Sequence, residues 1–174
     1  MKYNKALLRK IHSLALLNFR RARRYAQRLL NMRAPFQVIV FPYHFNGSEL
    51  KVLIALRSDE PYWQAISGGG EDDESFLAAA KRELAEETSL TGENWMKLDS
   101  MCMLPKIHYS GHEAWGKNIF VVPEYAFMVE ATGIPVCSEE HSELLWCSIK
   151  EADSRLKYDS NKNALWEVGQ RNKA

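Results

Sequence analysis

The sequence has few features of a membrane-spanning or disulfide-stabilised protein. No apolar run approaches the ~20 residues that a helix needs to cross a bilayer, so no transmembrane segment is expected. The chain has only three cysteines, and none of them has Cys-x-x-Cys spacing. An odd number without such spacing argues against both a disulfide framework and a zinc site. We therefore expect Cys102, Cys137 and Cys147 to be reduced, buried thiols of a cytoplasmic protein.

Internal repeats and low-complexity tracts are also missing, and neither sign of charge dominates. The 174 residues carry a formal net charge of +1, and 46% of them are hydrophobic. This composition excludes intrinsic disorder, and the length suffices for a domain with a buried core. We therefore expect one globular domain with a small appendage.

Acidic residues are absent from the first 33 positions. Ten of the 23 Lys and Arg residues lie there, which leaves 13 basic against 22 acidic residues downstream. Residues 5–30 also lack Gly and Pro, and their apolar positions recur at helical spacing, so residues 1–34 are expected to contain a basic amphipathic helix. This helix is expected either to lie on a protein surface or to contact an anionic membrane or RNA.

Two β-rich runs begin the remaining segment, residues 35–174. Residues 36–45 and 50–57 are rich in β-branched and aromatic side chains, and Asn46-Gly47 between them is a strong hairpin signal. Pro42 cannot donate a hydrogen bond to a ladder, so its strand is expected at a sheet edge or a bulge.

Further strands and helices alternate after this hairpin. Strands are expected at 62–66, 95–104, 119–130 and 143–149. Helices are expected at about 74–88, 150–157 and 160–170, the last with Asp159 or Ser160 as its N-cap. Strands on both sides of a central helix, followed by helices, predict an α+β fold around a mixed β-sheet.

Negative charge is concentrated in residues 67–90, directly after three glycines. Four consecutive acids, Glu71 to Glu74, follow the glycines. On the expected helix, Glu83, Glu86 and Glu87 are spaced so that they project from one face. Like charges at this spacing repel one another and destabilise a helix. The cluster therefore needs an explanation beyond helix formation.

Two interpretations of the cluster are open. A solvated acidic face is common, but it requires basic partners, and Lys81 and Arg82 are the local candidates. A hard divalent cation is the alternative, because Mg²⁺ takes carboxylate oxygens and is usually completed by substrate phosphates. The chain after residue 33 is net acidic, so it also needs a metal ion to neutralise the charge if it binds an anionic substrate. A carbonyl of the expected glycine loop can add a further ligand.

The spacing of the charged residues is specific. Gly68 is followed after five residues by Glu74, and after seven more by Arg82-Glu83-Leu84-x-Glu86-Glu87. This resembles the Nudix box, G-x5-E-x7-R-E-U-x-E-E-x-G-U, in which U is aliphatic. Where the family has its late glycine, which ends the helix in a left-handed conformation, this chain has Ser89. The substitution removes no metal ligand.

Segments outside the box resemble one subgroup of that family, the bacterial dihydroneopterin triphosphate and dATP pyrophosphatases. The lead-in Trp63-Gln64-Ala65-Ile66-Ser67-Gly68 is similar to theirs. Glu140-His141 followed by Trp146 resembles their Glu-His-x4-Trp segment, in which the glutamate reaches the metal site from a distal loop. The resemblance implies a Nudix-type α/β/α sandwich, with the basic N-terminal helix as an addition.

The resemblance also implies Mg²⁺-dependent hydrolysis of a small nucleotide substrate, with Mn²⁺ as a substitute metal. It assigns Glu83, Glu86 and Glu87 as metal ligands, completed by the carbonyl of Ser67 or Gly68. Glu83 is either a ligand or the base.

Further roles are expected for residues near the glutamates. Arg82 is expected to orient Glu83, and Glu74 to support the start of the helix. Glu140 is expected to be the catalytic base, a further ligand or an exposed loop acid. The residues expected to bind the substrate are Gly68, Gly69, Trp63 and Arg57. His141 is expected to be a loop or polar-edge residue.

The expected reaction converts a nucleoside or pterin triphosphate to a monophosphate and pyrophosphate. An alternative is the cleavage of ADP-ribose or another nucleoside-diphosphate sugar, because Pro105 lies where ADP-ribose-type members have a proline. A catalytically silent nucleotide-binding domain is a further alternative, against which the intact glutamates argue. The sequence leaves open whether the chain forms a homodimer.

Overall fold

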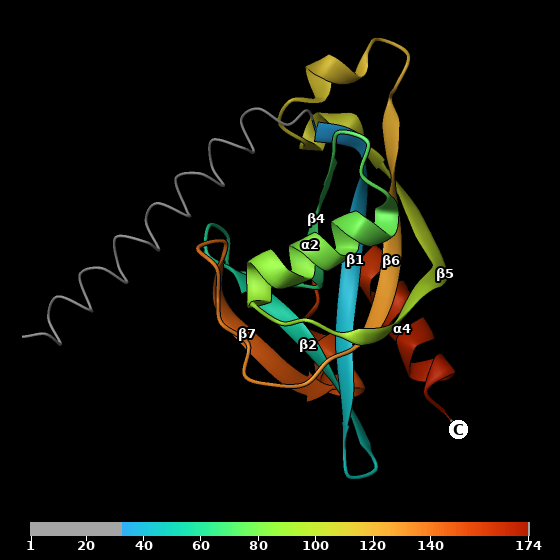
Figure 1. Cartoon of the computed structure of the whole chain (residues 1–174). Coiled ribbons are helices and arrows are strands. Elements are labelled where there is room, and N and C mark those ends of the chain that lie inside the picture. Colours follow the sequence, from blue (N-terminus) through green and yellow to red (C-terminus); the bar gives the residue numbers. More distant parts are fainter. Residues whose placement is uncertain (1–32, 174) are drawn as a thin grey trace, which may run out of the picture. The chain divides into compact units, whose positions relative to one another are not determined.

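The computed structural model of the chain describes residues 33–173, so the predicted basic helix of residues 5–30 lies outside the described residues. In chain order the described elements are β1 (Arg33–Asn46), β2 (Glu49–Arg57), β3 (Trp63–Gln64), β4 (Ile66–Glu71), α2 (Phe76–Thr88), β5 (Glu93–Pro105), the 3₁₀ helices η1 (Lys106–His108) and η2 (His112–Trp115), β6 (Val121–Glu130), β7 (His141–Ser148), α3 (Ile149–Arg155) and α4 (Asp159–Arg171) (Figure 1). Within the described part, the structure contains no helix of the length and apolarity that a membrane crossing requires.

The strands of the described part form one mixed sheet. Five of them follow the order β3-β2-β1-β6-β5, while β4 also pairs with β1 and β7 also pairs with β2. The β1–β6 pair is parallel and the other pairs are antiparallel. The predicted hairpin is confirmed, because Asn46 pairs with Glu49 and Gly47 takes the left-handed conformation with φ of 63°. The predicted mixed sheet is confirmed as well.

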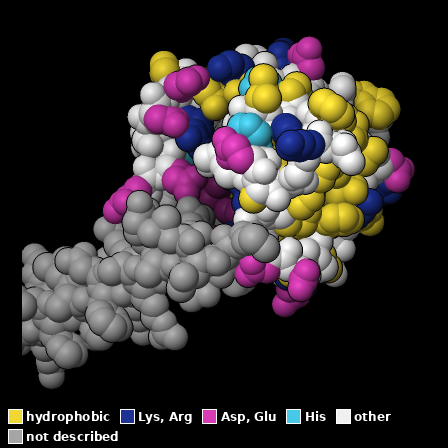
Figure 2. All heavy atoms as spheres, turned by 90° about the horizontal axis from the view of Figure 1, so that it is seen from above, with side chains coloured by type: hydrophobic (Ala, Val, Ile, Leu, Met, Phe, Trp, Pro, Cys, Tyr) yellow, Lys and Arg dark blue, Asp and Glu magenta, His cyan; other side chains and the backbone are white. Residues whose placement is uncertain are grey.

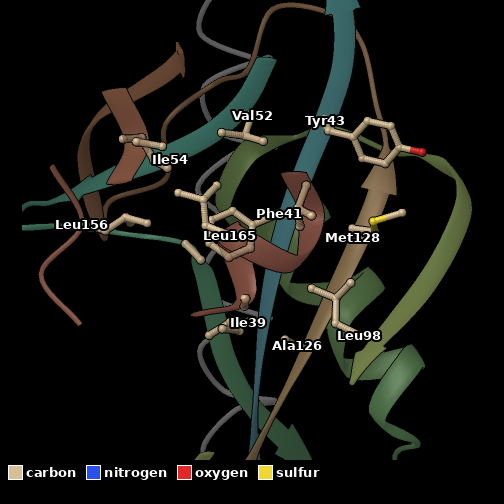
Figure 3. Packing of buried hydrophobic residues seen from close by; sticks show 14 of the residues in the cluster. Ile39, Phe41, Tyr43, Val52, Ile54, Leu98, Ala126, Met128, Leu156 and Leu165 are labelled. Carbon is tan, nitrogen blue, oxygen red and sulfur yellow. The ribbon is translucent and has the colours of Figure 1, made fainter. Parts of the chain in front are cut away.

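Both faces of the sheet are covered, which explains the continuous apolar run in β1. Val38 and Val40 point to one face and pack with residues of α2, whereas Ile39 and Phe41 point to the other face and pack with residues of α3 and α4. Figure 3 shows this second cluster, in which Phe41 lies beside Leu165 of α4. The α/β/α sandwich is therefore confirmed.

Pro42 was expected at a sheet edge or a bulge, and the edge alternative is wrong. Strand β1 lies inside the sheet, with β6 on one side and first β4, then β2, on the other. Its partner changes from β4 at Val40 to β2 at Tyr43, and Pro42 falls in the interval between these pairings. The proline is tolerated there because neither of these two strands pairs with it.

Helix α2 begins at Phe76, two residues after the expected start, and ends at Thr88 as expected. The hydroxyl of the N-cap Ser75 accepts a hydrogen bond from Ala78 N at 3.2 Å. Ser89 ends the helix with φ of 60° and ψ of 11°, the left-handed conformation that the family's glycine takes at this place.

The predicted cap of α4 and the predicted burial of the cysteines need correction. Tyr158 is the N-cap of α4, and Asp159 is the first helical residue, where its negative charge favours the helix N-terminus. Cys147 is buried and all three thiols are free, but Cys102 is half-buried and Cys137 is exposed. Cys137 is exposed because it lies in the loop between β6 and β7, which contributes little to the core.

Charged and apolar side chains are unevenly distributed on the surface. In the space-filling view, hydrophobic side chains form the most extensive patch on the right, and several acidic side chains lie on the left (Figure 2). The exposed apolar residues of the β5–β6 end are Met101, Met103, Ile107, Phe120 and Val121. This end of the sheet therefore presents an apolar surface.

Glu167 of α4 connects the helix to β5. Its two carboxylate oxygens accept hydrogen bonds from Asp99 N at 2.9 Å, from Ser100 N at 2.8 Å, from Ser100 Oγ at 2.6 Å and from Arg171 Nε at 2.7 Å. Burial alone raises the pKa of Glu167, but the hydrogen bonds led by Ser100 outweigh it and lower the pKa from 4.5 to about 2.

We expect Glu167→Gln to lower the free energy of unfolding at pH 7 by about 1–3 kcal/mol, because the amide leaves buried donors unpaired. A carboxyl whose folded pKa is lowered stabilises the protein above pH 4.5, and this contribution is lost as the pH falls towards 2. The difference in the free energy of unfolding between the wild type and Glu167→Gln, measured by denaturant titration, should therefore be smaller at pH 3 than at pH 7. Glu143→Gln, at an exposed position of β7, is the control. Equal stability of the wild type and Glu167→Gln at pH 7 would contradict this role.

Candidate active site

The three glycines before α2 do not form the expected loop. Gly68–Gly70 lie in β4, and Gly68 and Gly69 pair with β1. A Cβ atom at Gly68 would lie 2.0 Å from the carboxyl carbon of Glu83, and one at Gly70 would lie 2.0 Å from the ring of Phe36. Glycine is therefore required here because neighbouring side chains lie against the strand, and not because the backbone must be flexible.

We expect Gly68→Ala to lower turnover by about tenfold or more with a small loss of stability. Glu83 is only 4% exposed, so the added methyl group displaces a carboxylate that has little room to move. Gly70→Ala is the matched variant, and it should destabilise the fold by about 1–3 kcal/mol because it overpacks the core at Phe36. Turnover per folded molecule and melting temperature are measured for both. Full activity of Gly68→Ala would mean that the position of Glu83 is not critical.

Arg82 resolves the repulsion among the helix glutamates. Its guanidinium donates to Glu74 Oε2 at 2.9 Å, to Glu83 Oε1 at 2.7 Å and to Glu86 Oε2 at 3.4 Å. It also donates to the carbonyl oxygen of Gly69 at 2.7 Å, which ties α2 to β4. Burial opposes the charged form, but these carboxylates hold the pKa of Arg82 above its ordinary value.

Glu87 is paired with a histidine that sequence reasoning did not assign to the site. Its Oε2 lies 2.8 Å from His141 Nε2 and accepts from Ser67 N at 3.3 Å. Glu87 and His141 are 1% and 4% exposed, which corrects the expectation of a loop or polar-edge histidine. In the described part of the chain, Glu87 Oε1 is buried without a hydrogen-bond partner. Burial raises the pKa of Glu87, and the bond from His141 opposes this effect.

Glu140 reaches the same region from β7's start. Its charge contributes to the raised pKa of Glu87, after burial, so the two carboxyl groups are close enough to interact. Glu140 Oε2 lies 3.8 Å from Arg57 Nη1, and Arg57 also donates from Nε to Asp59 Oδ1 at 2.8 Å. The Glu140 side chain is 39% exposed. The structure thus brings Arg57 and Glu140 together beside the buried Glu87–His141 pair.

Trp63 packs against the core. It is half-buried against the hydrophobic cluster between the sheet and α4, and the guanidinium carbon of Arg155 lies 5.3 Å from its ring centroid. Tyr125 is likewise engaged, because it stacks on Phe76 with ring centroids 4.0 Å apart. Of the four predicted substrate-binding residues, Gly68 and Gly69 lie next to the Arg82 network and Arg57 lies beside Glu140, whereas Trp63 packs against the core.

The carboxylates of α2 have the chemistry that Mg²⁺ or Mn²⁺ requires. Carboxylate oxygens are hard donors, and the buried, unpartnered Oε1 of Glu87 is an acceptor that a cation would satisfy. Within residues 33–173, no three acidic, His or Cys side chains converge on a common point. The reason is that Arg82 binds Glu83 and Glu86, whereas Glu87 turns towards His141. The carboxylates are therefore suitable ligands for the ion, and two of them, Glu83 and Glu86, are hydrogen-bonded to Arg82.

Comparison with known proteins gives consistent matches. Residues 35–166 match the family described as the NUDIX domain. The dihydroneopterin triphosphate diphosphatase of Haemophilus influenzae is 34% identical over 125 residues, which are 66% of this chain and 76% of that protein. A candidate NUDIX hydrolase of Listeria monocytogenes has a similar structure, with a TM-score of 0.70, 37% identity and coverage of 79% of this chain and 94% of that chain. The dihydroneopterin triphosphate pyrophosphohydrolase of E. coli shares the fold, with a TM-score of 0.61, 21% identity and coverage of 79% and 97%.

Proposed function

The chain belongs to the NUDIX family, and on that premise we propose that it is a Mg²⁺-dependent pyrophosphohydrolase that cleaves a nucleoside or pterin triphosphate to the monophosphate and pyrophosphate. That it is a hydrolase of phosphoric anhydride bonds follows from the family. The choice of a triphosphate is supported by the Haemophilus influenzae relative, which is named for dihydroneopterin triphosphate. The observation that carries the proposal is Glu87, a buried carboxylate with an unpartnered oxygen on the face that also carries Glu83 and Glu86.

Four groups of this chain would hold the metal ions. They are the carboxylates of Glu83, Glu86 and Glu87 and the backbone carbonyl of Ser67. When bound, the ions neutralise the phosphates and lower the pKa of the attacking water. Ser67 is well placed for this role, because its N–H already donates to Glu87. The acidic site would otherwise repel a triphosphate.

Residues beside the carboxylates keep them in position. Arg82 orients Glu83 through a 2.7 Å hydrogen bond, and His141 orients Glu87 from the opposite side. Because Nε2 of His141 faces a carboxylate, this nitrogen carries a proton whenever Glu87 is ionised. Glu140, held beside Arg57, is the base that takes the proton of the attacking water.

The products distinguish this function from its alternative. A triphosphate substrate should give a monophosphate and pyrophosphate, whereas ADP-ribose would give two monoesters and no pyrophosphate. We expect phosphorus NMR to show pyrophosphate after incubation with Mg²⁺ and dATP, dGTP or dihydroneopterin triphosphate. Faster cleavage of ADP-ribose than of every triphosphate would overturn the proposal. Absence of turnover with all substrates would favour a silent nucleotide-binding domain.

A further inference from the structure

A lysine and two tyrosines form a cluster where the loop between β2 and β3 meets the segment between α3 and α4. The ammonium of Lys157 lies 3.9 Å from the ring centroid of Tyr62 and 5.3 Å from that of Tyr158. The two rings meet edge to face, with their centroids 5.4 Å apart. An aromatic ring attracts a cation above its face, so the two rings hold the ammonium group in place.

Backbone hydrogen bonds fix the position of this cluster. Lys157 N donates to the carbonyl oxygen of Trp63 at 3.1 Å, next to the bridge between Trp63 and Leu156. Arg57 N donates to the carbonyl oxygen of Tyr62, also at 3.1 Å. Lys157 is therefore connected through β3 to the end of β2.

Arg57 links the cluster to the candidate active site. On the opposite edge of β2 it pairs with His141, and its Nη1 lies 3.8 Å from Glu140 Oε2. The backbone of Tyr62 is thus two strand spacings from that of His141, or about 10 Å. A phosphate chain that begins at the glutamates of α2 and extends past Arg57 therefore reaches Lys157.

Carboxylates engage Lys157 less than they engage the two arginines of the site. Arg82 and Arg57 lie 2.7 Å and 2.5 Å from carboxylate oxygens. In contrast, Lys157 Nζ lies 3.6 Å from Glu60 Oε2, and these two side chains are 46% and 66% exposed. An exposed ion pair contributes little stability, so an anionic ligand can take the place of Glu60.

The phenol of Tyr62 adds a hydrogen-bond donor to the cluster. Burial, together with the neighbouring Tyr158, raises the pKa of Tyr62 to about 12, and the charge of Arg57 opposes this rise. The hydroxyl group therefore keeps its proton at neutral pH and can donate it. Positive charge and O–H donors suit the oxygens of an anion, so the cluster has the chemistry of a phosphate-binding group.

We propose that Lys157, positioned by Tyr62 and Tyr158, binds the terminal phosphates of the substrate, the portion that is released as pyrophosphate. This inference rests on the proposed function and adds a binding residue outside the NUDIX box. The glutamates hold one end of the phosphate chain through metal ions, and Lys157 neutralises the other end. Lysine suits this role because its ammonium group binds phosphate as a point charge.

The test measures the binding of inorganic pyrophosphate in the presence of Mg²⁺ by calorimetry. Lys157→Met keeps an unbranched stem but removes the charge, so its affinity for pyrophosphate should be about tenfold or more below that of the wild type. The affinity for dAMP, which lacks the terminal phosphates, should not change. Lys150→Met, which removes an exposed charge from α3, is the control and should match the wild type.

Three results would overturn the inference. They are the absence of pyrophosphate binding in the wild type, equal pyrophosphate affinities of the wild type and Lys157→Met, and an equal loss of affinity for dAMP. If Lys157→Met does not fold, Lys157→Gln serves for the same comparison.

Steady-state kinetics give a second readout. The proposed contact holds the substrate and the transition state alike, so Lys157→Met should raise KM for dATP about tenfold and leave kcat nearly unchanged. A purely structural role of Lys157 would instead lower the melting temperature and leave KM unchanged, and this result would overturn the inference.

Binding also separates this inference from the proposed function. Loss of pyrophosphate affinity in Lys157→Met supports the inference even if the wild type cleaves no triphosphate, in which case the proposed reaction alone fails. If the wild type releases pyrophosphate from dATP but Lys157→Met keeps the wild-type affinity and KM, the reaction stands and the inference alone fails.

Discussion

Replacing Glu87 or Glu86 by glutamine is expected to lower turnover by about a thousandfold or more while the fold is kept. Stabilisation of phosphate charge by a metal ion is worth several kcal/mol, which corresponds to roughly three orders of magnitude in rate. The amide oxygen of Glu87→Gln can still accept the hydrogen bonds from His141 and Ser67. Removing one charge also relieves repulsion on the helix face. The loss should therefore appear in activity and not in folding.

The measurement combines rate, metal binding and stability. Pyrophosphate release is followed at saturating Mg²⁺, Mn²⁺ binding is measured by electron paramagnetic resonance, and melting is followed by circular dichroism. Glu143→Gln, at an exposed position of β7, is the control and should match the wild type. Normal rates for both Glu86→Gln and Glu87→Gln would show that the metal site lies elsewhere.

Glu140→Gln is expected to lower turnover by about a hundredfold, and Glu139→Gln by less than a few-fold. Removal of a general base costs roughly 10²–10⁴ in rate. Glu140 is the member of this acidic pair that lies near Arg57 and interacts with Glu87, whereas the backbone carbonyl of Glu139 is held by Ser58 Oγ at 2.8 Å. The adjacent residue is therefore a matched control for charge and position.

The separate effects on kcat and KM distinguish a base from a structural acid. kcat should fall more than KM changes, because the proposed base acts on water and not on substrate binding. Equal kcat values for the two variants would return Glu140 to the status of an exposed loop acid.

Several parts of the structure follow from local sequence. Asn46-Gly47 directs a tight hairpin whatever the rest of the chain does, because its backbone conformation is intrinsic to these residues. The apolar period and the capping serine of α2 likewise act within a few residues, and they place Glu83, Glu86 and Glu87 on one helix. The box spacing thus indicates the family and places the three glutamates on one helix without any tertiary contact.

The expectations for the three glycines and for Pro42 failed because contacts with distant segments determine the structure there. Three consecutive glycines predict a loop, but β4 is a strand, because Glu83 and Phe36 need the space beside it. Pro42 predicts an edge, but β1 is internal, because its partner on one side changes at that point. The local sequence predicts neither the strand β4 nor the internal position of β1, because each depends on side chains or strands that are distant in the sequence.

Tertiary structure alone decided which polar groups meet. His141 lies 54 positions from Glu87, yet its imidazole ring and the Glu87 carboxylate share a buried 2.8 Å contact. Gln37 and Glu124 become neighbours only through the parallel pairing of β1 with β6. Sequence sets the local conformation of each strand through its own periodicity, but the register between distant strands is set by the burial of the whole core. That register determines which polar groups are buried together.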